Sequence, residues 1–139
     1  MKEVRFRAWH LKDKKMYYRA YQQFFSVLLC DRDPASDDGK GKPVRRAWYG
    51  DCFLLESTGL EDIQRREIFE GDIVRIRHRD RVFSGAVGPV PDTFGAGKIH
   101  PLKDLLERHG VNGYPDNLEI EILGNEFENP ELLEGLAKN

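Results

Sequence analysis

The sequence predicts a mainly β protein of the α+β class, built as a small bent antiparallel sheet or a partly open SH3-like barrel with one or two short helices. Three observations lead to this fold class. Apolar residues alternate with charged residues in several short runs, which is the period of a half-buried strand. Glycine, proline and charged residues separate these runs. Only two short segments carry a helical pattern.

The length and composition predict a single domain over residues 1–139. The 139 residues are 40% hydrophobic and 33% charged, which is ordinary for a globular protein and argues against wholesale disorder. The start, MKEVRFRAW, has no apolar leader region, and no apolar run approaches the length of a membrane span. We therefore expect a cytoplasmic protein with no membrane partner, whose Cys30 and Cys52 are free thiols.

The first part of the chain predicts a hairpin followed by an apolar segment and a surface loop. The period of the apolar segment suits a buried strand or a short piece of helix equally well. The loop is rich in charge and holds two prolines and two glycines. In order, these segments are the strand 4–8, the polar turn 11–15, the aromatic return strand 16–21, the apolar segment 24–30 and the loop 31–43.

The middle of the chain predicts more short strands. Segment 47–57 reads as a strand with Gly50-Asp51 as a turn or bulge, and STGL at 57–60 is expected to end it. A short extended stretch at 66–69 leads through Glu70-Gly71 into the strand 72–76.

The strand 72–76 continues into a tight turn around 78–80 and a return strand at 81–87. The length of that turn stays open. A three-residue turn would place Arg81 on the same face as Arg75 and Arg77, whereas a two-residue turn would not.

The last part predicts two helices around one strand. Pro101 suits the first helical position and Gly110 the stop of a helix at 100–110. The strand at 117–123 places Glu119 and Glu121 outward. In the closing segment, Asn129 is expected to cap a short helix that Pro130 begins.

The sequence shows no catalytic or metal-binding constellation. The four histidines are scattered, and none stands at a ligand spacing with either cysteine. GAGK at 95–98 lacks the first glycine and the final serine or threonine of a phosphate loop. We therefore expect no enzyme activity, no catalytic residues, no metal and no cofactor. An enzyme whose site forms only at a subunit interface remains as a third class.

Charge is distributed unevenly along the chain, although the net charge is only −2. Residues 1–50 carry 12 Lys and Arg against 6 Asp and Glu, whereas residues 116–139 carry 1 against 7. This asymmetry predicts contact between the two ends of the chain or between copies of it. Two separately solvated faces are the plain alternative.

Four arginines stand two residues apart in the strand and return strand at 72–87, at Arg75, Arg77, Arg79 and Arg81. They could form a solvated sheet face whose methylene stems cover apolar neighbours. They could pair with acidic residues such as Glu119 and Glu121 across strands or subunits, at roughly 0.2–1 kcal/mol per exposed pair. They could also contact nucleic-acid phosphates. Further candidates for that third role are the cations Arg5 and Arg7 and, as stacking surfaces, Trp9, Tyr17 and Tyr21.

Three segments together resemble one protein family. They are VRFRAWHLKDKKM (4–16), STGLEDIQRREIFEGDIVRI (57–76) and GNEFENPELLE (124–134). Each looks like a motif of the YopX protein family of phages and prophages, and the three occur in the family's order from one end of the chain to the other. The matching positions are Arg7, Ala8, Trp9, Thr58, Gly59, Leu60, Glu70, Gly71, Asp72, Val74, Gly124, Asn125, Glu128, Asn129 and Pro130.

The resemblance implies a small, mostly β, self-associating protein carried by phage genomes, and it implies no particular activity. The chain departs from the family pattern at 63–65, where a polar turn is usual, and at His10, where an acidic residue is usual. We expect a non-enzymatic binding or assembly module that forms homo-oligomers. The alternative is a nucleic-acid-binding accessory protein that uses the arginine strand, and another phage or host protein is a further expected partner.

Overall fold

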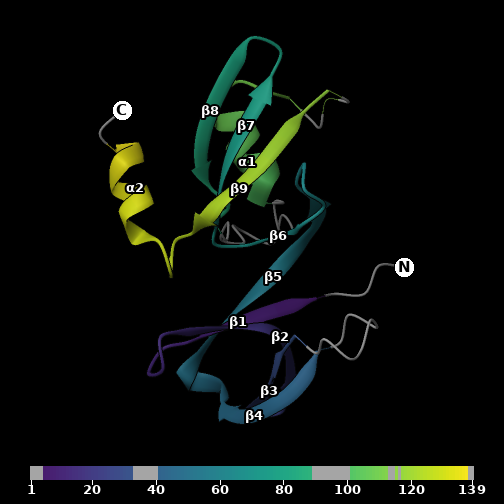
Figure 1. The fold of residues 1–139 in the computed structure, drawn as a ribbon, viewed down its shortest axis with the longest axis vertical. Helices are drawn as coiled ribbons and strands as arrows, with labels where there is room; N and C mark the ends of the chain where they lie inside the picture. Colours follow the sequence, from purple (N-terminus) through teal and green to yellow (C-terminus); the bar gives the residue numbers. More distant parts are fainter. Residues whose placement is uncertain (1–4, 33–40, 89–100, 113–114, 116, 138–139) are drawn as a thin grey trace, which may run out of the picture. The chain divides into compact units, whose positions relative to one another are not determined.

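A computed structural model describes residues 5–32, 41–88, 101–112, 115 and 117–137 of the chain (Figure 1). Contacts divide the chain into two compact units, which we call unit 1 (Met1–Ser57) and unit 2 (Thr58–Asn139). Most of the predicted surface loop at 31–43 lies outside the described residues, and so does the stretch that contains GAGK. The assignment of residues 1–139 to a single domain stays a prediction.

The described residues form nine strands, one turn of 3-10 helix and two short α-helices. The elements of the first half are β1 (Phe6–His10), β2 (Lys15–Gln23), β3 (Ser26–Asp31), β4 (Lys42–Trp48), η1 (Tyr49–Asp51) and β5 (Cys52–Glu61). Those of the second half are β6 (Glu67–Phe69), β7 (Asp72–His78), β8 (Arg81–Ala86), α1 (Pro101–Arg108), β9 (Glu119–Asn125) and α2 (Pro130–Ala137).

The strands of unit 1 form an antiparallel sheet in the order β4-β3-β2-β1-β5, and β6 follows β5 in the same sheet. Side chains that alternate along these strands make the core of the unit, because successive residues of a strand point to opposite faces. The fully or almost fully buried members are Ala8, Tyr17, Ala20, Val27, Leu29 and Ala47. The apolar segment whose period left strand and helix open is therefore strand β3, and Phe24 and Phe25 form the turn before it.

Two details of this half differ from the sequence-based prediction. The predicted strand at 47–57 is divided: β4 ends at Trp48, and the expected turn at Gly50-Asp51 lies in η1. STGL does not end β5, which runs on to Glu61. Gly59 adopts a φ of +79°, a conformation that glycine tolerates, so the strand bends there without ending.

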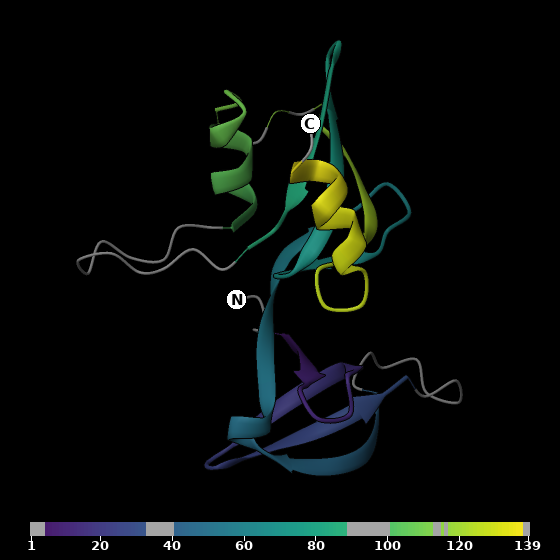
Figure 2. The ribbon, with the colours of Figure 1, turned by 90° about the vertical axis from the view of Figure 1, so that its left-hand side faces the viewer.

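The strands of unit 2 form a second antiparallel sheet in the order β8-β7-β9. As the alternation predicts, Val74 and Ile76 point into the core while Arg75 and Arg77 are exposed. Helix α1 covers the core face of this sheet (Figure 2), and its residues Leu102, Leu105 and Leu106 are buried there. The helix begins at Pro101 and is followed by Gly110 with a φ of +80°, as predicted.

Helix α2 lies alongside β8 (Figure 1). The protein is therefore mainly β with two short helices, as the alternating pattern predicts, and its two sheets are antiparallel. The described strands do not close into a barrel. A specifically SH3-like arrangement stays a prediction.

Candidate functional site

The β7–β8 hairpin settles where the four spaced arginines point. His78 pairs with Arg81, so the turn between them holds only Arg79 and Asp80. Because paired residues share a face of the sheet, Arg81 lies on the face opposite to Arg75 and Arg77. Arg79 occupies the turn itself with a φ of 59°. The four side chains therefore do not form one basic face.

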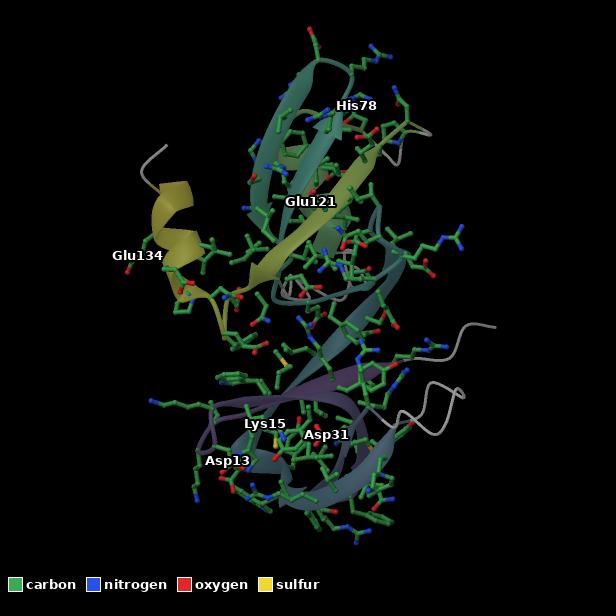
Figure 3. All side chains as sticks on the ribbon, in the orientation of Figure 1. Asp13, Lys15, Asp31, His78, Glu121 and Glu134 are labelled. Carbon is green, nitrogen blue, oxygen red and sulfur yellow. The ribbon has the colours of Figure 1, made fainter. Side chains whose placement is uncertain are left out.

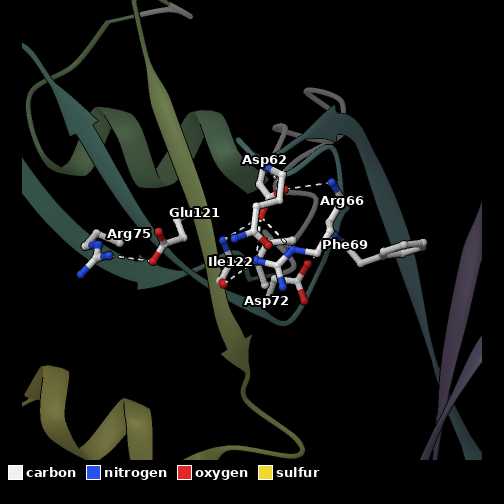
Figure 4. A network of polar contacts seen from close by, with 8 residues as sticks. Asp62, Arg66, Phe69, Asp72, Arg75, Glu121 and Ile122 are labelled. Carbon is white, nitrogen blue, oxygen red and sulfur yellow. Dashed lines mark hydrogen bonds and ion pairs between the residues drawn. The ribbon is translucent and has the colours of Figure 1, made fainter.

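Arg75 pairs with an acidic residue across strands. β7 and β9 run side by side with Arg75 opposite Glu121 and Arg77 opposite Glu119. The Arg75 Nη2 donates to the Glu121 Oε1 over 2.7 Å (Figure 4), and both side chains are partly exposed. Such a pair contributes roughly 0.2–1 kcal/mol. For Arg75, the cross-strand interpretation is thus the one that the structure shows.

Arg81 joins the hairpin to the end of α1. Its Nη2 donates to the backbone carbonyl of His109 over 2.5 Å. The His109 ring stacks on Phe83, with 4.3 Å between ring centroids and 15° between planes. The arginine therefore supports the packing of a helix end.

The other predicted contact residues lie in unit 1, on strands β1 and β2 or, for Arg5, just before β1. Arg5 is exposed, whereas Arg7 and Trp9 are half-buried on β1. Tyr17, predicted as an exposed stacking surface, is buried in the core of unit 1, where it pairs with the buried Ala8. Tyr21 is half-buried. These residues belong to unit 1, whereas the arginines of β7 and β8 belong to unit 2, and their joint contact with nucleic acid stays a prediction.

Asp62 is the centre of a hydrogen-bond network that sequence reasoning missed (Figure 4). Its Oδ1 accepts the backbone N–H groups of Gln64 and Arg66, each over 2.9 Å. Its Oδ2 accepts the Arg66 Nε over 3.1 Å and the backbone N–H of Ile122 over 3.2 Å, and it pairs with the Arg66 Nη2 at 2.9 Å. We call residues 62–66, held in this way, the Asp62 clasp.

The Asp62 clasp covers the outer edge of β9. The backbone N–H of Ile63 donates to the carbonyl of Ile120 over 2.8 Å, and the Arg66 Nη2 donates to the carbonyl of Ile122 over 2.9 Å. These backbone groups point away from β7 and would otherwise lack a partner in the sheet. The departure from the family pattern at 63–65 thus lies in a segment that protects a strand edge.

The environment of Asp62 favours its ionised form. Burial by itself raises the pKa of a carboxyl group, because it disfavours the charged state. Here the N–H groups of Arg66 and Ile122, the Arg66 guanidinium and the N–H of Gln64 outweigh burial and hold the pKa of Asp62 below its ordinary value of 3.8.

The motif Glu70-Gly71-Asp72 builds the turn into β7. Gly71 has a φ of +90°, and the buried Asp72 accepts the backbone N–H of Phe69 through its Oδ2 over 2.8 Å. The Gly71 N–H donates to the carbonyl of Val87, and the Gly71 carbonyl accepts the N–H of Glu126 over 2.8 Å. The positive φ of Gly71 and the contact of Asp72 with Phe69 thus build this turn.

The closing motif forms a compact loop between β9 and α2. The Asn125 Oδ1 accepts the N–H groups of Phe127 and Glu128, and the Asn125 Nδ2 donates to the Glu128 Oε1 over 2.8 Å. The Asn129 Oδ1 accepts the N–H of Asn125 over 3.2 Å, so this side chain holds the loop instead of capping α2 as predicted. A Cβ on Gly124 would lie only 2.4 Å from that oxygen, which explains a glycine there.

The other motif positions are structural as well. The Thr58 Oγ1 donates to the carbonyl of Ile68 over 2.8 Å and accepts the N–H of Leu60 over 3.2 Å, which ties β5 to β6. Ala8 is fully buried in the core of unit 1, and Val74 is fully buried in the core of unit 2. These motifs encode turns and packing.

Both cysteines are free, and burial raises the pKa of each thiol. Among the described residues, no three His, Cys, Asp or Glu side chains gather as a metal site. His10, on β1, is buried, and its Nδ1 accepts the backbone N–H of Asp13 over 3.1 Å. None of the helices in the described segments has the length and apolar character needed to cross a membrane.

An exposed aromatic cluster in unit 1 escaped the sequence analysis. Phe24 and Phe25 form the β2–β3 turn, Trp48 ends β4, and Tyr49 follows in η1. All four are exposed, from Tyr49 at 48% to Phe24 at 96%. The sequence signal was present in FFSVLL and AWYG, but periodicity alone could not show which of these apolar residues face solvent.

Comparison with known proteins places the chain in a family. The sequence model of one family, described as YopX protein, matches residues 5–134. The chain belongs to the YopX protein family. No curated protein sequence matches the chain. A solved structure with a similar fold is that of protein EF1440 from Enterococcus faecalis, with a TM-score of 0.52 and 21% identity over 96% of this chain and 99% of that one.

Proposed function

We propose that this YopX-family chain is a non-enzymatic binding and assembly module that associates with copies of itself. The observation that carries the proposal is the division of charge between the two units. Unit 1 holds 12 Lys and Arg against 8 Asp and Glu, a net of +4, and unit 2 holds 10 against 16, a net of −6. Opposite charges favour contact between the basic unit of one copy and the acidic unit of another.

Such a contact joins two different surfaces, so it is heterologous and produces rings or filaments instead of a closed symmetric dimer. Both surfaces offer exposed charges. Glu131 and Glu134 are exposed on α2, and Glu134 points away from the helix (Figure 3). Lys42, Arg45 and Arg46 are exposed on β4 of unit 1.

A second observation supports a non-enzymatic role. The buried polar side chains of Asp62, Asp72 and Asn125 hold backbone N–H groups of turns and strand edges. A catalytic site needs polar groups that converge on a substrate, whereas these side chains hydrogen-bond to the backbone and hold the fold together. The family resemblance, and not the geometry, supports the phage or prophage context, and the free thiols of Cys30 and Cys52 support a cytoplasmic location.

Light scattering on the full chain over a range of concentrations tests self-association. We expect a mass above that of one chain at about 50 mM salt, falling toward one chain at about 500 mM salt, because salt screens contacts between exposed charges. The double variant Glu131→Lys and Glu134→Lys should lower the mass at low salt, and the neutral pair Glu131→Gln and Glu134→Gln should lower it less. The mass of a single chain under every condition would contradict the proposal.

A further inference from the structure

We infer that unit 1 binds single-stranded nucleic acid on a surface that we call the aromatic platform. It consists of Phe24, Phe25, Arg46, Trp48 and Tyr49. Bases stack on the exposed rings and phosphates contact the arginine. The inference names a ligand for the binding module proposed above and rests on that proposal, but it needs no self-association.

Strand pairing brings the aromatic residues together. Gln23 pairs with Ser26, which leaves Phe24 and Phe25 as the two turn residues between β2 and β3. Ser26 pairs in turn with Trp48 on β4, and the N–H of Tyr49 donates to the carbonyl of Phe25 over 2.9 Å. Four rings from two segments therefore lie at one end of the sheet.

These rings are exposed to an extent that folding does not explain. The exposed fractions are 96% for Phe24, 81% for Phe25, 64% for Trp48 and 48% for Tyr49. Large aromatic side chains usually bury most of their area, and a group of exposed ones marks an interaction surface.

Phe24 adds a second sign of function. Its φ is 48°, in the left-handed region that disfavours a side chain with a large Cβ substituent. A strained and fully exposed phenylalanine gives the fold neither buried area nor a relaxed turn. Strain of this kind is typical of functional sites.

The Trp48 ring is held in place by a glycine. A Cβ built on Gly50 would lie 2.0 Å from one ring carbon of Trp48 and 2.6 Å from two others. The ring therefore rests against the bare backbone of Gly50 while more than half of the side chain remains exposed. A ring supported in this way is a ready platform for a base, and ordering it on binding costs little.

The charge beside the rings suits a polyanion. Arg46 and Trp48 are two residues apart on β4, so their side chains share the outward face. Arg46 is exposed and makes no ion pair with any residue in the described part of the chain. Its neighbour Arg45 is held by Asp13, and Lys42 adds a further exposed cation at the start of the strand.

Single-stranded nucleic acid fits this combination of rings and cations better than a nucleic-acid duplex or a second copy of the chain does. Unpaired bases offer flat faces and phosphates at a regular spacing, which match rings and cations placed side by side. A duplex hides the faces of its bases. A symmetric contact between two copies of β4 would set arginine against arginine.

The test is fluorescence anisotropy of labelled mixed-sequence single-stranded DNA, single-stranded RNA and duplex DNA with the full chain. The mass of the same protein is followed by light scattering. We expect both single strands to bind more tightly than the duplex and binding to weaken as salt rises, because phosphate contacts release counterions.

The variants test three contributions separately: stacking of a base on the Trp48 ring, the position of that ring, and the charge of Arg46. Trp48→Ala should weaken binding about 5- to 100-fold, and Trp48→Phe should weaken it less. Gly50→Ala keeps the ring but pushes it aside, so it should weaken binding without unfolding unit 1. Arg46→Ala should lower the slope of log affinity against log salt by about 0.7, the value for one phosphate contact on a single strand.

Phe24→Gly shows whether weaker binding could come from unfolding, because this change removes a ring of the platform and also relieves the positive φ of Phe24. It should keep or raise the midpoint of thermal unfolding while binding weakens. The matched controls are Arg77→Ala and Val82→Ala, which remove an exposed cation and an exposed apolar side chain from unit 2. Both should bind like the original chain.

Failure of the inference can be told apart from failure of self-association. Folded protein that binds none of the three probes at low salt overturns the inference, whatever its mass. Controls that weaken binding as much as Trp48→Ala also overturn it. If Trp48→Ala dissociates an oligomer and leaves binding unchanged, the aromatic platform belongs to a second copy. A single-chain mass with intact, platform-dependent binding supports the inference and removes only self-association.

Discussion

At the scale of single residues, Asp62 shows how one buried carboxylate organises chain segments that are far apart in sequence. Its side chain is inaccessible to solvent, and it accepts backbone N–H groups from its own turn and from Ile122, 60 residues away. Arg66 supplies the compensating charge at 2.9 Å. Burying a carboxylate is unfavourable unless it is paired and fully hydrogen-bonded, and both conditions are met here.

Replacement of Asp62 by asparagine should therefore destabilise unit 2. The amide keeps one acceptor oxygen, but it loses the ion pair and sets an N–H group against Arg66 or the backbone donors. We expect a loss of about 1–3 kcal/mol in the free energy of unfolding, measured by urea denaturation at neutral pH.

The pH dependence of that loss follows from the direction of the shift. Because the pKa of Asp62 is lower in the folded protein than its ordinary value of 3.8, its stabilising effect is complete above pH 3.8. The effect disappears as the pH falls through the folded-state pKa. The difference between the original chain and Asp62→Asn should therefore shrink progressively as the pH falls from 3.8 through the folded-state pKa. The exposed Asp80, changed to asparagine, is the control and should alter stability by no more than about 0.5 kcal/mol. A constant difference across the acid range would contradict this assignment.

At the scale of elements, the junction between β9 and α2 depends on the lack of a side chain at Gly124. An added Cβ would meet the Asn129 Oδ1 at 2.4 Å and the Leu132 Cδ1 at 3.0 Å. Gly124→Ala should break the hydrogen bond from Asn125 to Asn129 and loosen α2, with an expected loss of about 1–3 kcal/mol in urea unfolding. Gly88→Ala is the matched control, since a Cβ there has no neighbour within 4 Å. Equal effects of the two variants would show that the close approach does not matter.

The sequence predicts the elements whose pattern is strong. Alternation assigns β7 and β9 and their inward residues, and the proline and glycine at its ends locate α1. It fails where tertiary contacts decide. Gly59 looks like a strand breaker, but β5 continues through it to Glu61, with Gly59 at a positive φ. Asn129 looks like a helix cap, but its oxygen meets the N–H of Asn125 instead.

The candidate site is predictable to a smaller degree. The sequence offers pairing of the spaced arginines with acidic residues such as Glu119 and Glu121 as one of three alternatives, and only the register of β7 and β9 sets Arg75 opposite Glu121. The length of the β7–β8 turn decides the position of Arg81, and spacing alone leaves that length open. The aromatic platform depends on which residues face solvent and on the close fit of Trp48 to Gly50. The spacing of apolar residues in the sequence predicts neither of these features.

At the scale of the whole molecule, the two units have separate hydrophobic cores. Every residue of one cluster lies in unit 1 and every residue of the other lies in unit 2. Leu29→Ala and Leu105→Ala form a matched pair, because both side chains are buried to 99% or more. Each should lower stability by about 2–5 kcal/mol. In hydrogen exchange, protection should fall mainly in the unit that carries the change.

Equal loss of protection in both units after either change would instead indicate one cooperative domain over residues 1–139. This measurement therefore also decides the single-domain prediction. Confinement to one unit would mean that the two halves can be destabilised independently.

The Asp62 clasp has a further consequence, for solubility. The strand that it covers, EIEILGN, carries two isoleucines and a leucine, and the uncovered edge of a strand with apolar residues is a template for cross-β growth. The contacts of Asp62 and Arg66 with Ile122 occupy that edge in the folded chain. We therefore expect the Asp62 carboxylate also to protect the protein from fibril formation, and we expect strong acid, which neutralises this carboxylate, to uncover the strand edge.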